Sequence, residues 1–153
     1  MIRFATHNDI PRLLELLRQV NRVHHDIRPD IFKPHTTKYD AAQLRELLAQ
    51  PDKAVFVYDD NEVAGYAIVL TEEVRDDRLM QDCRMLYIDD ICVDERLRGK
   101  HIGSRLFDHV CSYARNIGCH TVTLNVWEGN DTAMAFYRKS GMRIRKTCME
   151  IRL

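Results

Sequence analysis

A short segment rich in basic residues and glycine is the part of this sequence best suited to bind an anion. Arg96–Gly103 contains three Arg or Lys residues and two glycines, and it follows the apolar, β-branched run Met85–Val93. Downstream, apolar residues recur at helical spacing over Ile102–Ile117. The first N–H groups of a helix have no intrahelical partner, and its N-terminus carries partial positive charge. Glycines let a ligand approach that backbone, so the segment is predicted to cradle a diphosphate.

The spacing of this loop excludes two common phosphate-binding motifs. A Walker loop has four residues between its glycines and then Lys-Ser/Thr, whereas three residues separate Gly99 from Gly103. The dinucleotide fingerprint G-x-G-x-x-G is absent as well. A basic helix start by itself is more often a capping and solubility feature than a ligand site. The loop alone therefore leaves both interpretations open.

A second pattern lies downstream, in the segment Asn130–Met142, which reads NDTAMAFYRKSGM. Either of its first two residues can cap a short helix, and Gly141 can end it. Ala133 and Tyr137 are one helical turn apart and share a face. The phenol of Tyr137 is a proton donor with an ordinary pKa of about 10. This segment is therefore predicted to place an acid on a short helix.

The two patterns together resemble the signatures of the GNAT superfamily of acyl-CoA-dependent N-acyltransferases. Arg98–Gly103 is similar to that family's R/Q-x-x-G-x-G/A loop, with His101 where the family usually has its first glycine. Asn130–Met142 resembles the family's other signature, N-x-x-A-x-x-F-Y-x-x-x-G-F/M. Both occur in the family's order, separated by one helix and one strand.

The resemblance implies the GNAT fold, an α/β (α+β) architecture, and one domain over residues 1–153. Its central sheet is mixed and mostly antiparallel, and about four helices flank it. The one parallel pair of neighbouring strands would be Met85–Val93 and Thr121–Val126, joined by the helix Ile102–Ile117 as a right-handed crossover. In the family these two strands splay apart, and the acyl-pantetheine chain enters the gap.

The resemblance also implies acetyl-CoA as co-substrate and no metal. Backbone groups on the central strand would contact the pantetheine, and these belong to Ile91, Cys92 and Val93. The diphosphate would be held by the loop and the first helical turn, namely Arg98, Gly99, Lys100, His101, Ile102, Gly103 and Ser104. Asn130 would lie beside the pantetheine arm, and Ala133 and Tyr137 complete the predicted cofactor-binding set.

Tyr137 is the predicted acid that protonates the departing sulfur. A thiol pKa of about 8.5, below that of a phenol, means that the proton helps without being indispensable. The oxyanion donor implied by the family is a backbone N–H near Ile91.

The general base has no clear signature in the sequence. Asn125 stands where some bacterial protein N-terminal acetyltransferases of the family carry a glutamate, and an amide cannot take a proton. Strand alternation predicts Asp89 and Asp90 on opposite faces, so that at most one faces the acceptor. Asp90, acting through water, is the predicted base. The alternative that both lie on a solvated or bulged strand segment stays open, and His24 and His25 are weaker candidates.

The composition limits the partners. With 23 basic and 23 acidic residues, no global field attracts nucleic acid or an anionic membrane, and no apolar run is long enough to span one. Five scattered cysteines without a C-x-x-C pair suit reduced thiols and a cytoplasmic location rather than disulfides or zinc. The expected partner is a small-molecule or peptide amine, and the resemblance also allows a homodimer.

The remaining pattern predicts further elements. Strands are expected at Ile2–Ala5, Lys53–Tyr58, Val63–Leu70 and from Met142 onward. An irregular connector is expected at Val23–Pro34, a loop or frayed strand at Glu72–Arg84, and a helix opened by a Thr37/Asp40 capping pair.

These features predict an N-acetyltransferase that moves an acetyl group from acetyl-CoA to a primary amine by direct attack in a ternary complex. Two alternatives are a catalytically inactive acyl-CoA-binding domain and a regulatory or scaffold domain. The first of these alternatives is not excluded, because His101 replaces the family's first glycine and Asn125 cannot act as a base.

Overall fold

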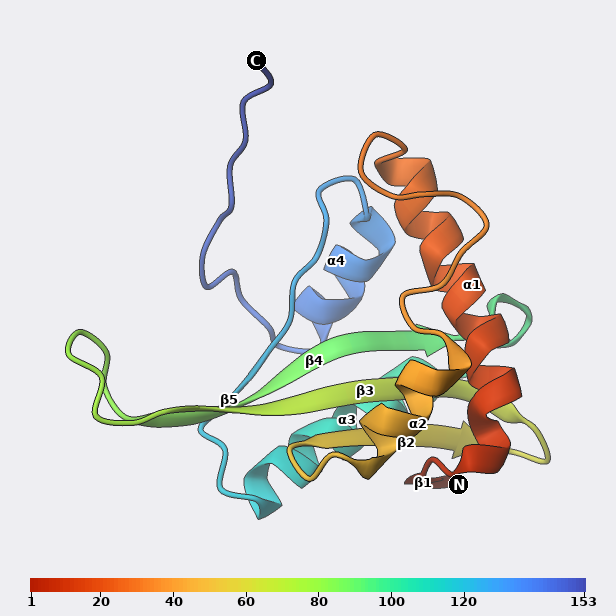
Figure 1. Ribbon diagram of the computed structural model, residues 1–153, viewed down its shortest axis with the longest axis horizontal. Coiled ribbons are helices and arrows are strands. Elements are labelled where there is room, and N and C mark those ends of the chain that lie inside the picture. Colours follow the sequence, from red (N-terminus) through yellow and green to blue (C-terminus); the bar gives the residue numbers. More distant parts are fainter.

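The computed structural model describes residues 1–153 and contains one mixed sheet of five strands in the order β1-β2-β3-β4-β5. Neighbouring strands are antiparallel except β4 and β5, which are parallel, as the resemblance implies. The strands are β1 Ile2–Phe4, β2 Lys53–Asp59, β3 Val63–Val74, β4 Cys83–Val93 and β5 Thr121–Thr123. Figure 1 shows the sheet with helices packed on it. The predicted fold class is confirmed.

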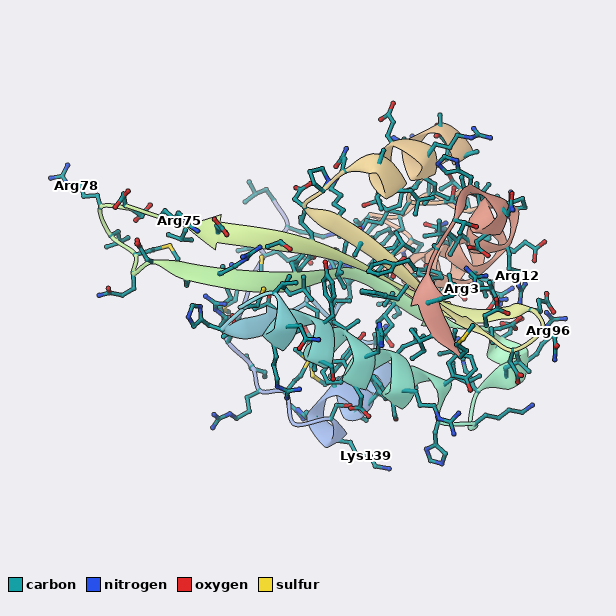
Figure 2. The ribbon with its side chains drawn as sticks, turned by 90° about the horizontal axis from the view of Figure 1, so that it is seen from below. Arg3, Arg12, Arg75, Arg78, Arg96 and Lys139 are labelled. Carbon is teal, nitrogen blue, oxygen red and sulfur yellow. The ribbon has the colours of Figure 1, made fainter.

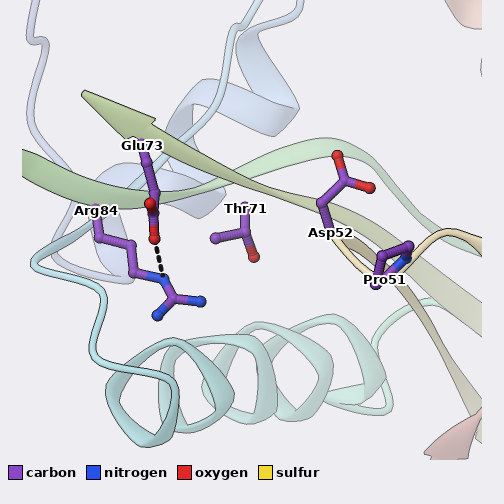
Figure 3. A pocket seen from close by; sticks show the side chains of 5 residues that line it. All are labelled: Pro51, Asp52, Thr71, Glu73 and Arg84. Carbon is purple, nitrogen blue, oxygen red and sulfur yellow. Dashed lines mark ion pairs between the residues drawn. The ribbon is translucent and has the colours of Figure 1, made fainter. Parts of the chain in front are cut away.

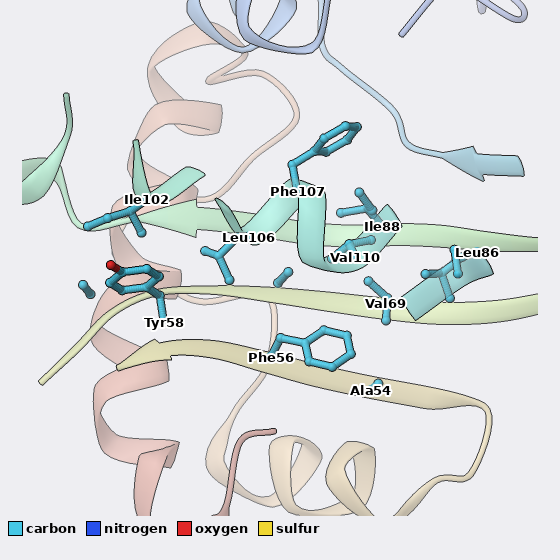
Figure 4. Packing of buried hydrophobic residues seen from close by; sticks show 13 residues of the cluster. Ala54, Phe56, Tyr58, Val69, Leu86, Ile88, Ile102, Leu106, Phe107 and Val110 are labelled. Carbon is cyan, nitrogen blue, oxygen red and sulfur yellow. The ribbon is translucent and has the colours of Figure 1, made fainter. Parts of the chain in front are cut away.

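Four α-helices flank the sheet, and their apolar faces build two core clusters. They are α1 Ile10–Ile27, α2 Ala41–Ala49, α3 Ile102–Asn116 and α4 Asp131–Lys139, with short 3-10 turns at His7–Asp9 and Glu95–Leu97. The cluster under α3 includes Phe56, Leu86 and Leu106 (Figure 4), and α4 packs against it. The cluster under α1 and α2 includes Leu13 and Tyr66. None of the helices is both long and apolar enough to cross a membrane.

The hairpin between β3 and β4 is longer than predicted. The ladder continues from Thr71↔Leu86 to Val74↔Cys83, so both ends of the segment predicted as a loop or frayed strand at Glu72–Arg84 lie in regular strands. Backbone hydrogen bonds between the strands keep these residues extended. Charged side chains are tolerated because both faces of the sheet are solvated there, so the segment lacks the apolar pattern that would predict a strand. The resulting arm projects from the molecule, with Arg75 and Arg78 at its far end (Figure 2).

Two predicted boundaries near the N-terminus also need correction. The connector predicted to begin at Val23 is helical as far as Ile27, because helix α1 continues through both histidines. Helix α2 is capped by Asp40, whose side chain accepts from the N–H of Gln43 at 2.8 Å, while Gln43 bonds back to the N–H of Asp40. The capping box therefore pairs Asp40 with Gln43 and not Thr37 with Asp40.

The C-terminal segment Met142–Leu153, here called the tail, forms no strand. Its last backbone hydrogen bond within the chain joins the N–H of Met142 to the carbonyl of Tyr137. The predicted strand is therefore wrong, since the backbone of residues 143–153 makes no hydrogen bond within the chain. β5 is shorter than predicted for the same reason, because Leu124–Val126 have no partner.

Candidate active site

The two parallel strands pair over only three residues each and then separate. β4 bonds to β5 through Met85–Tyr87 and Thr121–Thr123, whereas β3 follows β4 as far as Val93. Beyond Tyr87 the edge of β4 that faces β5 has no strand partner. Figure 1 shows the chain after β5 rising away from β4 toward α4. This is the splay that the resemblance implies, and it exposes backbone groups of Ile91–Val93.

The basic loop at the end of β4 leaves its backbone donors unused. No hydrogen bond within the protein uses the N–H groups of residues 99–104, which include the first turn of α3. Arg98 and Lys100 are exposed and take part in no ion pair, unlike Arg96. Six free N–H groups with two free cations match the charge and hydrogen-bonding needs of a diphosphate. The residues present therefore fit the group that the family implies.

His101 precedes α3 in a left-handed conformation. Its φ is 60° and its ψ is 16°, and its side chain makes no capping hydrogen bond. Glycine adopts this backbone without steric cost, whereas other residues lose about 1–2 kcal/mol. The conformation explains why the family usually has glycine here, and it shows that histidine keeps the backbone shape that glycine would adopt.

A buried carboxylate holds this loop against α1. Asp94 is fully buried and accepts from the guanidinium groups of Arg12 on α1 and, at 2.8 Å, Arg96. It also caps the turn at Glu95–Leu97 through the N–H of Arg96. The bonds from Arg96 keep the pKa of Asp94 well below its usual range, so it stays charged. Arg12 and Arg96 lie near each other in Figure 2. Arg96 therefore helps to hold the loop in place and, unlike Arg98 and Lys100, is already paired.

The start of α3, the end of β4 and helix α4 meet at Gly103. A Cβ added to Gly103 would lie 3.6 Å from both Val93 and Phe136. Ile102 and Cys92 are 6% and 7% exposed, so only their backbone groups can reach a ligand. Ser104 is half-buried in the same turn. The predicted diphosphate loop and the predicted acid helix are thus in contact.

β4 carries one extra residue at Asp89. Ile68 of β3 lies opposite Asp90 while Val69 lies opposite Ile88, so Asp89 has no partner in the ladder. This β-bulge turns both aspartates toward the α1 and α2 side of the sheet. The prediction that they lie on opposite faces is therefore wrong, because the extra residue breaks the alternation.

The two carboxylates differ in their partners. Asp89 is paired with Lys38 at 2.8 Å and accepts from the hydroxyl of Tyr39. Asp90 is half-buried and accepts from the hydroxyl of buried Tyr66 at 2.8 Å. Burial raises the pKa of Asp90 to about 6, although the bond from Tyr66 and the charge of Lys38 oppose the rise. Asp90 is thus the carboxylate that can exchange a proton near neutral pH.

Tyr137 is half-buried on α4, and its ring packs against Phe107 and Phe136 with centroids 6.2 and 5.2 Å away. Burial raises its pKa well above the ordinary value, and the negative charges of Asp90 and Cys92 add to the effect. The phenol therefore stays protonated.

The other residues predicted around the site have structural partners. Asn130 caps α4, and its side chain accepts from the N–H of half-buried Ala133 at 3.3 Å. Asn125 donates to the hydroxyl of Tyr87 at 3.1 Å, so it neither bonds to an aspartate nor carries a base. His24 stacks on Phe32, with ring centroids 5.0 Å apart, and His25 bonds to the carbonyl of Phe32.

A polar hollow lies on the projecting arm, away from these groups. Figure 3 shows it between the start of β2 and the β3–β4 ladder, with Glu73 paired to Arg84 at 3.3 Å. Its lining has no large apolar side chain and consists of Pro51, Asp52, Thr71, Glu73 and Arg84. None of the predicted site residues contributes to it, so it is separate from the candidate site.

Sequence reasoning missed the residues that tune the aspartates. Tyr66, Tyr39 and Lys38 come from β3 and the connector before α2, and only strand register and tertiary packing bring them to β4. Asp94 was missed as well, although its place directly before six residues of which three are basic was a usable signal.

Known proteins resemble this chain in sequence. The model of the acetyltransferase (GNAT) family matches residues 20–142. The chain is 24% identical over 147 residues to peptidyl-lysine N-acetyltransferase YjaB of Salmonella typhimurium, covering 94% of this chain and 83% of that protein. It is 25% identical over 101 residues to glucosamine 6-phosphate N-acetyltransferase of Arabidopsis thaliana, which is 65% of this chain and 66% of that enzyme.

Solved structures agree. A mutant of the BH1408 protein from Bacillus halodurans superposes with a TM-score of 0.96 at 31% identity, covering 100% of this chain and 99% of that one. A putative acetyltransferase from Agrobacterium tumefaciens gives a TM-score of 0.74 at 25% identity, again over 100% and 99% of the two chains. The family model, the splayed strand pair and the two sequence patterns all lead to the same conclusion: this chain belongs to the acetyltransferase (GNAT) family.

Proposed function

We propose that this protein is an N-acetyltransferase that moves an acetyl group from acetyl-CoA to a primary amine by direct attack in a ternary complex. The observation that carries the proposal is the junction of β4, α3 and α4. There a loop with six unused N–H groups and two unpaired cations adjoins the splayed strands. Its first helical turn contacts α4, which carries Tyr137, and β4 carries Asp90. Relatives named as peptidyl-lysine and glucosamine 6-phosphate N-acetyltransferases support an amine acceptor.

The loop would hold the diphosphate of the co-substrate. Arg98 and Lys100 supply charge, and the N–H groups of residues 99–104 supply directional hydrogen bonds. The unpaired edge of β4 would receive the pantetheine through Ile91–Val93, and the N–H near Ile91 would stabilise the oxyanion. When bound, acetyl-CoA supplies an activated acyl group as a thioester.

Tyr137 would give its proton to the departing sulfur. A thiol has a pKa of about 8.5, so a thiolate can leave unaided, but protonation prevents the reverse attack. The raised pKa of Tyr137 keeps the phenol protonated at neutral pH. Its packing against Phe107 and Phe136 fixes the ring.

Asp90 would take a proton from the ammonium form of the acceptor, directly or through water. Deprotonating a lysine-like ammonium at pH 7 costs roughly 4–5 kcal/mol, so a nearby acceptor for the proton matters. A carboxylate with a pKa of about 6 is better matched to this task than an ordinary one. Asp89 is less suited because Lys38 and Tyr39 already occupy its oxygens.

The test is thiol release from acetyl-CoA across a panel of amines, polyamines, amino sugars, amino acids and lysine peptides. We expect turnover with at least one acceptor, and Tyr137→Phe should lower kcat by about a hundredfold, the low end for acid catalysis. Tyr113→Phe, which removes a hydroxyl from α3 on a ring that packs against Phe4 and Phe56, is the matched control. Near wild-type activity in Tyr137→Phe would remove the assignment of the acid. Binding of acetyl-CoA without turnover on any amine would instead indicate an acyl-CoA-binding domain.

A further inference from the structure

One lysine of this chain is held beside the proposed base. The chain has six lysines, and Lys38 is the one whose ammonium group makes hydrogen bonds. Its Nζ lies 2.8 Å from Oδ1 of Asp89 and 3.0 Å from the carbonyl oxygen of the same residue. Lys38 belongs to the connector between α1 and α2, which passes over β4 in Figure 1. A primary amine of the protein itself therefore contacts the strand that carries Asp90.

The bulge in β4 puts this amine on the same side of the sheet as Asp90. Asp89 and Asp90 both turn toward α1 and α2, where Asp90 accepts from the hydroxyl of buried Tyr66. Only Asp90 separates the carbonyl of Asp89, which binds the ammonium, from the N–H of Ile91. One residue of a strand spans about 3.3 Å. The proposed base and the proposed oxyanion donor are therefore both within reach of the flexible lysine stem.

The backbone on both sides of Lys38 is fixed. The hydroxyl of Thr37 donates to the carbonyl of Tyr39 at 2.6 Å, and the hydroxyl of Tyr39 donates to the second oxygen of Asp89. Tyr39 also packs against the core cluster under α1 and α2, and Asp40 caps α2. A reacting group held in this way has the high effective concentration of an intramolecular reaction.

The ion pair with Asp89 does not trap the ammonium. The side chain of Lys38 is 46% exposed. An ion pair open to solvent contributes little stability, because water screens it and holding a long side chain in one geometry costs entropy. The hydroxyl of Tyr39 stays on Asp89 when the ammonium leaves. Lys38 can therefore turn from Asp89 toward an acyl group without loss of the contact that fixes the connector.

We propose, on the basis of the function proposed above, that this protein acetylates its own Lys38 by intramolecular transfer from acetyl-CoA. Nζ of Lys38 forms a bond to the acetyl carbon, and the bond between that carbon and the CoA sulfur breaks. The ammonium loses two protons in all. One passes to Asp90 and then to solvent, and the other replaces the proton that Tyr137 gives to the sulfur. The products are the chain acetylated at Lys38 and the free thiol of CoA.

Mass spectrometry of the lysines is the first test. The unacetylated chain is incubated with deuterium-labelled acetyl-CoA, and the label at each lysine is followed in time. Lys33, which is exposed in the same connector, reports the uncatalysed background. Lys38 should be labelled at least about tenfold faster than Lys33, because it is held beside the acyl group. Tyr137→Phe should slow the labelling of Lys38 by about a hundredfold and leave that of Lys33 unchanged, whereas Tyr113→Phe should change neither.

The outcome separates this proposal from the proposed function. Equal labelling of Lys38 and Lys33, together with turnover of external amines, overturns the self-acetylation alone. Equal labelling with no turnover on any amine overturns the self-acetylation and the proposed function together.

Dilution distinguishes transfer within one chain from transfer between copies. With acetyl-CoA saturating, the first-order rate constant for labelling of Lys38 should be the same at every protein concentration. A rate constant that falls in proportion to the protein concentration overturns the intramolecular transfer.

The arrangement can also be tested without any reaction. In acetonyl-CoA a methylene group separates the sulfur from the acetyl group, so no acyl group is transferred. In a chain with carbon-13 lysines, nuclear Overhauser effects should connect the ε-methylene of Lys38 to the acetyl methyl of the bound analogue. Lys33 should show no such contact. Binding of the analogue, seen as a thermal shift, without a contact to Lys38 overturns the proposal.

Discussion

Asp89 and Asp90 are adjacent in the sequence, and the groups around them separate their chemistry. Lys38 and Tyr39 occupy the two oxygens of Asp89, whereas burial raises the pKa of Asp90 to about 6. The single hydroxyl of Tyr66 compensates only in part. The site therefore contains one carboxylate whose oxygens are already bonded and one that can titrate near pH 6.

The first prediction at the residue scale concerns the pH dependence of the rate. If Asp90 is the base, kcat/KM should fall as pH drops below about 6, because Asp90 becomes protonated. Asp90→Asn should lose about a hundredfold in rate and also lose this limb of the profile. Asp89→Asn is the matched control and should keep the limb. If kcat/KM of Asp90→Asn still falls below about pH 6, the group that titrates there is not Asp90.

A second residue-scale prediction concerns stability. Asp90 has a pKa of about 6 when folded and about 3.9 when unfolded, so between these values the folded protein binds more protons. The contribution of the neutral group is full below pH 4 and is lost as pH rises through 6. Asp90→Asn keeps an acceptor for Tyr66 and removes the buried charge.

Urea denaturation measures this effect. At pH 7.5 Asp90→Asn should be more stable than wild type by about 1–2 kcal/mol, and the difference should shrink toward pH 4. If Asp90→Asn is no more stable than wild type at pH 7.5, the charge of Asp90 does not destabilise the folded protein.

Sequence reasoning reached the residues of the loop and Tyr137 because their types and spacing are local. It favoured Asp90 but placed Asp89 and Asp90 on opposite faces, because a bulge has no reliable local signature. The pairing that creates it, between Ile68 and Asp90, joins residues 22 positions apart. The hydroxyl partner of Asp90 was missed for the same reason.

At the scale of elements, one buried carboxylate connects helix α1 to the end of β4. Asp94 has no exposed surface and receives bonds from Arg12 and Arg96. The loop that follows carries the unpaired Arg98 and Lys100. Its position relative to the sheet therefore depends on a contact made by a helix near the opposite end of the sequence.

The prediction for this contact is a loss of stability. Asp94→Ala should cost about 3 kcal/mol, because it leaves Arg12, whose side chain is 14% exposed, without its buried partner. Glu95→Ala is the matched control in the same turn. It removes the exposed pair with Arg22 and should cost no more than about 1 kcal/mol. Equal losses in urea titrations would contradict a special role for Asp94.

Element types followed from the sequence more reliably than element ends. Apolar periodicity predicted α3, because that helix buries one face. Continuous apolar runs predicted the hairpin of β2 and β3, because these strands are buried on both faces. The ends of β3 and β4 were missed because pairs of exposed, charged residues extend the ladder. The helical state of residues 23–27 was missed because helix α1 continues beyond its two histidines. The strand expected in the tail is absent because the backbone of residues 143–153 makes no hydrogen bond within the chain.

At the scale of the whole molecule, binding of the co-substrate should appear as a gain in global stability. A ligand at about 100 times its Kd stabilises the folded state by about 2.7 kcal/mol. Arg98→Ala with Lys100→Ala should remove most of the thermal shift caused by CoA. Arg78→Ala, at the tip of the projecting arm, is the control and should keep it.

Raising the salt concentration should weaken the shift in the unmodified chain, because exposed cations contribute through screened charge. A full thermal shift in the double variant would show that the diphosphate does not bind at this loop. No shift in any variant would favour a domain that does not bind the nucleotide.

The extra residue in β4 makes the length of that strand part of its chemistry. Before the bulge, Leu86 and Ile88 face the cluster under α3, and after it Ile91 and Val93 do so. Deleting Asp89 would remove the bulge and leave the strand in strict alternation, with Ile91 and Val93 on the same face as now. A regular strand that kept Asp89 would instead turn Ile91 and Val93 away from α3. The bulge therefore lets β4 carry a second carboxylate without exchanging the inside and the outside of the sheet.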